Sequence, residues 1–274
     1  MSTMTELTTT QVNKIEEPIL LRADREGVTT LTLNRPKHYN ALSEAMLAAL
    51  QTALDQIATD SAIRVVVLAA NGKAFCAGHD LKQMRATPNQ DYYTTLFNQC
   101  SRMMLTIHQL PQPVIAKVQG IATAAGCQLV AACDLAVAAA GAAKFATSGI
   151  NVGLFCATPA VPVSRNIARK QAMDMLLTGD FIDAQTALAW GLVNRLAPTE
   201  QLDAAVDELA QAILAKSFVA VSMGKQMFYK QLEMGLSDAY RYASEVMACN
   251  MIAEDAGEGI DAFIEKRPAT WKHR

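Results

Sequence analysis

The chain has little charge and few aromatic residues, and these shortages narrow the classes of protein to which it can belong. Asp, Glu, Lys and Arg together make up 18% of the 274 residues, and Phe, Trp and Tyr make up 6%. The net charge is -2 and the basic residues form no long run, so we expect neither a nucleic-acid nor an anionic-membrane partner. A chain of this length can bury a substantial core, and a hydrophobic content of 51% predicts buried subunit surface besides that core.

The chain also lacks any recognisable pairing of its six cysteines. They are scattered singly, with no C-x-x-C pair and no histidine at metal-ligand spacing, so we expect a reducing compartment and no metal site. Residues 1–17 are rich in threonine and have no apolar central segment, which predicts a disordered tail rather than a signal or transit peptide. We therefore predict a cytoplasmic protein. The most apolar stretch, residues 115–140, is interrupted by polar residues such as Lys117 and Asp134, so we predict no membrane span. Asp134 itself is expected to be a structural acceptor.

Hydrophobic periodicity predicts an α/β chain. Short alternating or β-branched runs typical of strands occupy residues 19–22, 28–33, 65–69, 113–118 and 135–139. Apolar residues recur at helical spacing after Ser43, a natural N-cap, and the pattern beyond about residue 165 is helical, with no comparable strand after Val193. We therefore divide the chain into a tail over 1–17, a core over 18–200 and a helical C-terminal region over 201–274.

Two turns of small residues carry the candidate chemistry. Residues 124–126, Ala-Ala-Gly, follow the predicted strand 113–118 and precede an apolar helical run. Helix N-termini leave N–H groups unpaired and carry partial positive charge, so this turn suits a developing oxyanion. The turn at residues 76–80, Cys-Ala-Gly-His-Asp, offers a second N–H. Two converging donors stabilise an enolate or a tetrahedral species by about 10²–10³ in rate each, although either turn alone is more typical of tight packing.

Both turns, with the segments around them, resemble the crotonase (enoyl-CoA hydratase/isomerase) superfamily. The resemblance runs from Ile19 to Trp271 and includes Asn-Arg-Pro at 34–36, Pro-Val-Ile-Ala at 113–116 and Trp-Gly-Leu-Val-Asn at 190–194. Residues 77–82, 124–129 and 151–156 are most similar to the group of enoyl-CoA hydratase domain-containing protein 3. The resemblance implies a ββα spiral core with a helical C-terminal trimerisation region, a homotrimer or homohexamer, and a lyase of fatty-acid metabolism. It also implies that coenzyme A is part of the substrate and that no cofactor is bound permanently.

Carried over residue by residue, the resemblance places the thioester oxygen between the backbone N–H groups of His79 and Ala125. The residues that would line the channel for coenzyme A are Ala77, Asp80, Leu81 and Lys82. Its nucleotide end would be closed by Phe263 and Lys266, from the same or a neighbouring subunit. We expect Asp80 to act mainly as a helix cap. The two lysines are equally consistent with solvated surface charges.

Two positions depart from the pattern of a hydratase. Hydration needs one carboxylate to activate water and one carboxylic acid to deliver a proton to carbon 2, each contributing about 10²–10⁴-fold. Gln128 and Gly149 stand at these positions, and neither can exchange a proton near neutral pH. We therefore predict an acyl-CoA-binding enzyme of the enoyl-CoA hydratase/isomerase type that stabilises an oxyanion or enolate but hydrates poorly. Replacing both residues with glutamate is expected to raise the hydration rate.

Other groups are candidates for proton transfer. His79 comes first, because an unperturbed imidazole has a pKa near neutrality, unless its ring faces the channel or solvent and only its N–H is used. Cys156 comes second, although a buried free cysteine is usually inert. The segment around His79 resembles methylmalonyl-CoA decarboxylases, which share Ala-Gly-His-Asp. These enzymes have a tyrosine where Cys156 stands. Decarboxylation by His79 is thus one alternative, and a non-catalytic acyl-CoA binder is the other.

Overall fold

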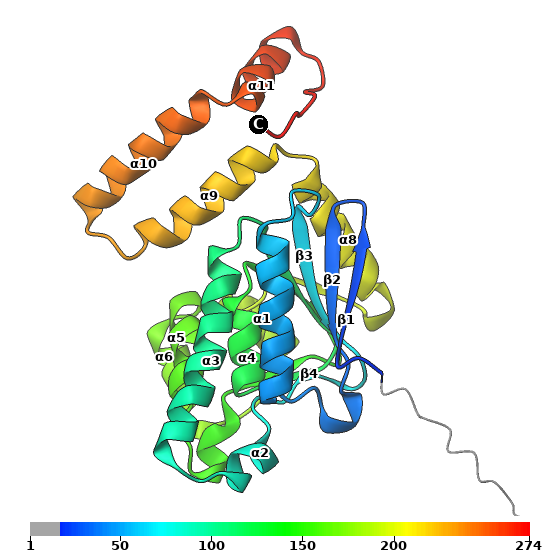
Figure 1. The fold of residues 1–274 in the computed structure, drawn as a ribbon, viewed down its shortest axis with the longest axis vertical. Coiled ribbons are helices and arrows are strands. Elements are labelled where there is room, and N and C mark those ends of the chain that lie inside the picture. The colour runs from blue at the N-terminus through cyan, green and yellow to red at the C-terminus, as the bar shows by residue number, and fades with distance from the viewer. Residues whose placement is uncertain (1–16) are drawn as a thin grey trace, which may run out of the picture.

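A computed structural model describes residues 17–274, which form an α/β core and a helical arm (Figure 1). The tail predicted for residues 1–17 lies outside the described residues except for Glu17. The strands are β1 (Leu20–Arg25), β2 (Val28–Leu33), β3 (Val65–Ala70), β4 (Ala74–Cys76), β5 (Val114–Val118), β6 (Ile121–Thr123), β7 (Leu135–Ala139), β8 (Lys144–Ala146), β9 (Ile182–Asp183) and β10 (Arg195–Ala197).

The helices confirm the predicted change from a mixed pattern to a helical one. The α-helices are α1 (Glu44–Ala58), α2 (Leu81–Ala86), α3 (Gln90–Gln109), α4 (Ala125–Ala132), α5 (Ala157–Asn166), α6 (Arg169–Thr178), α7 (Ala184–Trp190), α8 (Leu202–Leu214), α9 (Phe218–Gln231), α10 (Leu236–Met251) and α11 (Glu254–Glu265). Three short 3-10 helices are η1 (Pro36–His38), η2 (Ser148–Val152) and η3 (Thr199–Gln201). Ser43 caps α1 as expected, its hydroxyl accepting from the Met46 N–H at 3.3 Å.

Two sheets form the core, and the chain alternates between them. The larger sheet has the order β1-β2-β3-β5-β7-β10, and the smaller one β4-β6-β8-β9. The successive pairs β3 and β4, β5 and β6, and β7 and β8 each place one strand in either sheet and are followed by helices, so the path is a ββα spiral. The expectation of no strand after Val193 is wrong, because β10 pairs with β7. With two or three residues, strands such as β4, β9 and β10 are too short to show a period.

The larger sheet is covered on both faces, as the near-continuous apolar run at residues 65–69 predicted. Every residue of β3 is buried. Val66 and Leu68 belong to the main core with α1, α3 and α4, whereas Val65 and Val67 pack on the opposite face against α8. Successive side chains of a strand point to opposite faces, which explains the two cores. No helix among residues 17–274 is long and apolar enough to cross a membrane.

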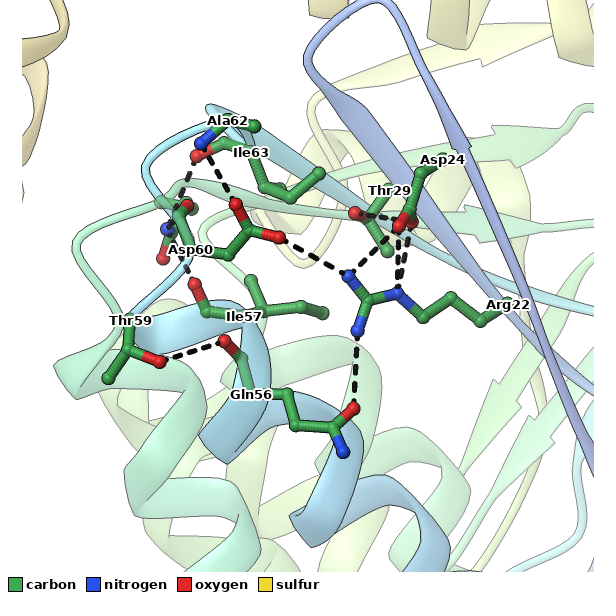
Figure 2. Close-up of polar contacts among 10 residues, drawn as sticks. Arg22, Asp24, Thr29, Gln56, Ile57, Thr59, Asp60, Ala62 and Ile63 are labelled. Atoms are coloured by element: carbon green, nitrogen blue, oxygen red, sulfur yellow. Dashed lines mark hydrogen bonds and ion pairs between the residues drawn. The ribbon is translucent and has the colours of Figure 1, made fainter.

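Polar contacts tie the edge hairpin β1–β2 to the end of α1 (Figure 2). The Arg22 guanidinium donates to Asp24 at 3.0 and 3.1 Å and to the Gln56 side chain at 3.3 Å, and it lies 3.8 Å from the Asp60 carboxylate. These groups are partly exposed, so each contact contributes little to stability. Their role is to fix the edge strand over the helix.

The arm of α9, α10 and α11 extends away from the core (Figure 1), and one lysine anchors it. Lys225 is the one buried residue of α9. Its ammonium donates to the carbonyls of Ile107 and Gln112 at 2.8 and 2.9 Å and to Asp134 at 2.7 Å. The Asp134 carboxylate also accepts from the Tyr229 hydroxyl at 2.8 Å and from the backbone N–H that follows Pro113 at 2.6 Å. The expectation that Asp134 is a structural acceptor is confirmed.

Candidate active site

The two small-residue turns meet at one edge of the smaller sheet. β4 and β6 are parallel neighbours, so the turns that follow them emerge side by side. A Cβ built on Gly126 would lie 2.0 Å from the carbonyl oxygen of Cys76. A Cβ built on Gly78, whose φ is +90°, would lie 3.0 Å from the Ala124 methyl and 3.1 Å from the Ala125 nitrogen. The two glycines therefore permit a backbone contact that any side chain would prevent.

Each turn presents a backbone N–H that is free within residues 17–274. The residues beside His79 are paired with Leu42, because the Leu42 N–H donates to Gly78 at 2.8 Å and the Asp80 N–H to Leu42 at 3.4 Å. The N–H groups of His79 and of Ala125, the first residue of α4, have no backbone acceptor in this part of the chain. Both can donate to an incoming carbonyl oxygen, and the N-terminus of α4 adds partial positive charge.

The first turn of α4 is set by an unusual backbone at Ala124. This residue has φ 50° and ψ -120°, a combination that glycine adopts readily and alanine rarely. Its N–H donates to the Ala146 carbonyl at 3.0 Å, and its own carbonyl accepts from the Gln128 N–H at 3.0 Å. These two bonds hold the reversal between β6 and α4, which leaves the Ala125 N–H without a backbone acceptor among the described residues.

The His79 side chain is turned into the protein. Its ring packs edge-on against Phe97 of α3 with the ring centres 5.3 Å apart, and Nε2 is buried with no partner among the described residues. Burial lowers the pKa of this imidazole to about 4. The expectation of a near-neutral pKa is wrong, because desolvation disfavours the charged ring and no carboxylate offsets that effect. The imidazole is neutral at pH 7.

Gln128 and Gly149 lie in contrasting surroundings. Gln128 stands one helical turn beyond Ala125 and is only 3% exposed, with an Oε1 that has no partner within residues 17–274. At Gly149, a Cβ would lie 2.5 Å from the Leu154 carbonyl oxygen and 2.8 Å from the Cys156 sulfur. The expectation that glutamate can simply be restored at position 149 therefore conflicts with the structure, because the backbone of the following loop fills the space of the side chain.

The Cys156 thiol takes part of that space. It is buried and accepts a hydrogen bond from the Gly149 N–H. Burial nevertheless raises the pKa of this thiol above its usual value, so it stays protonated at neutral pH. Nearby, the hydroxyls of Thr123 and Ser148 lie 2.6 Å apart. The side chains of Thr123, Ser148 and Cys156 near Gly149 are thus neutral.

The residues predicted to line the channel for coenzyme A follow the His79 turn. Asp80 caps α2 as expected, because its carboxylate accepts from the backbone N–H groups of Lys82 and Gln83 at 3.2 and 3.3 Å. Leu81 is 51% exposed and Lys82 is also exposed, whereas Ala77 is half-buried. This segment therefore presents apolar and cationic groups next to the turn.

Phe263 and Lys266 lie elsewhere. Phe263 belongs to α11 and is 84% exposed, and Lys266 is the left-handed C-cap of the same helix. Figure 1 places α11 and α2 at opposite ends of the molecule. A single chain thus does not bring these two residues to the oxyanion turns. Within residues 17–274, no group of three His, Cys, Asp or Glu side chains is arranged to hold a metal ion.

Two residues of this region were not singled out from the sequence. Phe97 contacts the imidazole from 18 positions away, and Thr147 is fully buried with a hydroxyl that has no partner among the described residues. Neither carries a sequence signal. Ala124 was predicted as part of a small-residue turn, but its unusual backbone conformation carries no sequence signal.

Comparison with known proteins identifies the class. The enoyl-CoA hydratase/isomerase family model matches residues 23–274, so the chain belongs to this family. A crystal structure of enoyl-CoA hydratase from Mycobacterium smegmatis has 57% identity and a TM-score of 0.92, covering 93% of this chain and 99% of that one. The crotonase-like ββα fold predicted from the sequence is confirmed.

The resemblance to the group of enoyl-CoA hydratase domain-containing protein 3 is confirmed as well. The mitochondrial protein of that name from Rattus norvegicus is 45% identical over 91% of this chain and 83% of its own length. The crystal structure of the human protein of that name has 42% identity and a TM-score of 0.90, covering 93% of this chain and all of that one. Mitochondrial enoyl-CoA hydratase from Pongo abelii is 33% identical over 92% of this chain and 86% of its length.

These relatives correct the predicted location. The proteins from rat, Xenopus laevis, mouse and human that are 43–45% identical to this chain are all named mitochondrial, which contradicts the prediction of a cytoplasmic protein. The prediction rested on unpaired cysteines and on the composition of residues 1–17. Unpaired cysteines indicate a reducing environment and do not distinguish one reducing compartment from another.

Proposed function

We propose that this chain is an enzyme that binds acyl-CoA thioesters and stabilises an oxyanion or enolate between the N–H groups of His79 and Ala125. The observation that carries the proposal is the contact of two glycine turns that each leave one N–H without a backbone acceptor. Such donors, fixed before the substrate arrives, need no reorganisation as charge develops on the thioester oxygen. Family membership supports the same chemistry.

Hydration is expected to be slow. The Gln128 amide orients a water molecule but cannot take its proton, and position 149 has no room for an acid. The reaction class best suited to these groups forms or uses a thioester enolate without activating water strongly. Cys156, protonated and held by the Gly149 N–H, is the proposed proton donor near carbon 2.

Decarboxylation of a malonyl-type thioester is the second candidate, and the missing carboxylates favour it. That reaction needs an oxyanion site and a proton donor, but no base to activate water. Nε2 of His79 has no partner among the described residues, and it would reach such a substrate only after the ring turns away from Phe97. A carboxylate of the substrate next to this ring would raise its pKa, since an opposite charge favours the protonated form. A non-catalytic acyl-CoA binder is the remaining candidate.

Completion of the nucleotide end of the site is proposed to require a second copy of the chain. Ala77, Asp80, Leu81 and Lys82 would hold coenzyme A near the thioester. Phe263 and Lys266 would come from a neighbouring copy in a homotrimer or homohexamer. Large apolar side chains exposed on the arm support this assembly, among them Leu236, Met247, Ile252, Phe263 and Ile264.

One set of measurements tests these proposals. Titration of the pure protein with acetyl-CoA and crotonyl-CoA in a calorimeter should show binding, and the melting temperature should rise. Turnover is then followed as hydration of crotonyl-CoA and as CO₂ release from methylmalonyl-CoA. Absence of heat and of thermal stabilisation with every ester would refute the acyl-CoA site. A 29.5 kDa monomer by light scattering at micromolar concentration would refute the assembly.

A further inference from the structure

We propose that the methyl group of Ala124 determines which acyl groups the site accepts, favouring thioesters that are unbranched at carbon 2. The inference rests on the proposed function, in which the thioester oxygen accepts from the N–H groups of His79 and Ala125. Ala124 is then a specificity-determining residue that takes no part in proton transfer.

The backbone at Ala124 shows that the methyl is present in spite of a conformational cost. With φ 50° and ψ -120°, the residue occupies a region in which a Cβ crowds the backbone and glycine does not. Hydrogen bonds to Ala146 and from Gln128 on either side hold the conformation. Glycine would fit this position at the start of α4 without strain, so the presence of alanine points to a role of its methyl group.

The methyl lies between the two oxyanion turns. Ala124 is half-buried, and its Cβ would be 3.0 Å from a Cβ built on Gly78, so it faces the opposing turn. The methyl carbon of Ala124 is also three covalent bonds from the nitrogen of Ala125, whose N–H has no backbone acceptor among the described residues. A carbonyl oxygen that accepts from Ala125 must therefore approach close to this methyl. The two substituents of that carbonyl, the sulfur and carbon 2, pass beside it.

The side chain of Gln128 independently indicates that a ligand group comes here. Its Oε1 is buried and has no partner within residues 17–274. Side chains on a helix lean toward its N-terminus, which directs Gln128 toward Ala124 and Ala125. A buried acceptor without a donor is costly unless a ligand or water supplies the donor. We infer that Oε1 of Gln128 lies beside the acyl group of a thioester bound at this turn.

Replacing one hydrogen on carbon 2 by a methyl adds a group that competes with Ala124 for this space. A single methyl group changes binding in a close-fitting pocket by about 10–200-fold. We therefore expect wild type to bind butyryl-CoA at least about tenfold more tightly than 2-methylpropanoyl-CoA, its isomer branched at carbon 2. The same crowding disfavours methylmalonyl-CoA against malonyl-CoA in the decarboxylase alternative.

Calorimetric titration of wild type and Ala124→Gly with the two butyryl isomers tests the proposal. The variant should reduce the affinity ratio to less than about threefold, mainly through tighter binding of the branched ester. Its melting temperature should rise by about 2–6 °C as the strain is relieved. The control is Ala48→Gly, at an exposed position inside α1, which should lower the melting temperature by about 2 °C and leave the ratio unchanged.

The outcomes separate this inference from the function on which it rests. If neither ester binds to wild type, the acyl-CoA site itself is refuted and the role of Ala124 falls with it. If both esters bind and Ala124→Gly leaves their ratio as it is in wild type, the acyl-CoA site stands and the specificity role is refuted. A lower melting temperature of Ala124→Gly would show that the methyl stabilises the turn, and would overturn the argument from strain.

Discussion

Introducing a side chain at Gly149 should damage this protein rather than turn it into an efficient hydratase. The smallest change is Gly149→Ala, which adds one methyl 2.5 Å from the Leu154 carbonyl oxygen and 2.8 Å from the Cys156 sulfur. The sulfur belongs to a side chain that can rotate, but the oxygen belongs to the backbone. The Leu154 N–H also donates to the Gly149 carbonyl at 2.9 Å, so the two residues cannot separate freely.

The cost follows from these contacts. Overpacking a closed site by a methyl group costs about 1–3 kcal/mol, and breaking the bond from Leu154 to Gly149 adds about 0.5–1.5 kcal/mol. We therefore expect Gly149→Ala to lower the free energy of unfolding by about 1.5–4.5 kcal/mol. With a urea m value of about 3 kcal/mol per M, the midpoint should fall by about 0.5–1.5 M. Gly149→Glu should lose at least as much and gain no hydration of crotonyl-CoA.

The assay is urea unfolding followed by circular dichroism, with Gly224→Ala as the matched control. Gly224 lies inside α9, and a Cβ there would meet nothing within 4 Å. Alanine should stabilise that position by about 0.5–1 kcal/mol, because it lowers the entropy of the unfolded chain. The reasoning is refuted if Gly149→Glu unfolds at the wild-type midpoint and hydrates crotonyl-CoA faster than wild type.

Three further outcomes are expected. Gln128→Glu alone should raise the rate of crotonyl-CoA hydration by up to about 10²-fold, because a carboxylate can take a proton from water. If the rate at which the double bond of crotonyl-CoA disappears is unchanged, Gln128 does not face the reacting carbons. Lys225→Met should lower the free energy of unfolding by about 3–5 kcal/mol, since it leaves Asp134 buried without its cation. As a control in the same urea series, Lys216→Met at an exposed position should change the free energy of unfolding by less than about 0.5 kcal/mol. The pKa of His79 is lowered to about 4 in the folded chain, so between pH 6.5 and 4 the unfolded chain binds the proton first and the free energy of unfolding falls as the pH falls. Between pH 7 and pH 5 the free energy of unfolding of wild type should fall by about 2 kcal/mol more than that of His79→Gln. Equal falls for the two proteins would place the ring in solvent.

The sequence determined those features that depend on neighbouring residues. The near-continuous apolar run at residues 65–69 predicted a strand covered on both faces, because burial on both sides leaves no place for polar residues. Ser43 and Asp80 were predicted as caps from their position before helical segments, and both accept from backbone N–H groups of the first turn. The segments shared with the enoyl-CoA hydratase/isomerase family specified the fold as a whole.

Tertiary structure alone decided how the site is assembled. The contact between Gly78 and Ala124 joins residues 46 positions apart, and it exists because three-residue strands, too short to show a period, align two turns at one sheet edge. The neutral state of His79 depends on burial against Phe97, and the crowding at Gly149 depends on how the loop to Cys156 closes. Lys225 and Asp134, 91 residues apart, likewise meet only in the folded chain. Desolvation and steric exclusion depend on which groups surround a residue in space. The amino-acid sequence therefore determined which groups are present, and the fold determined their protonation states and the space available around them.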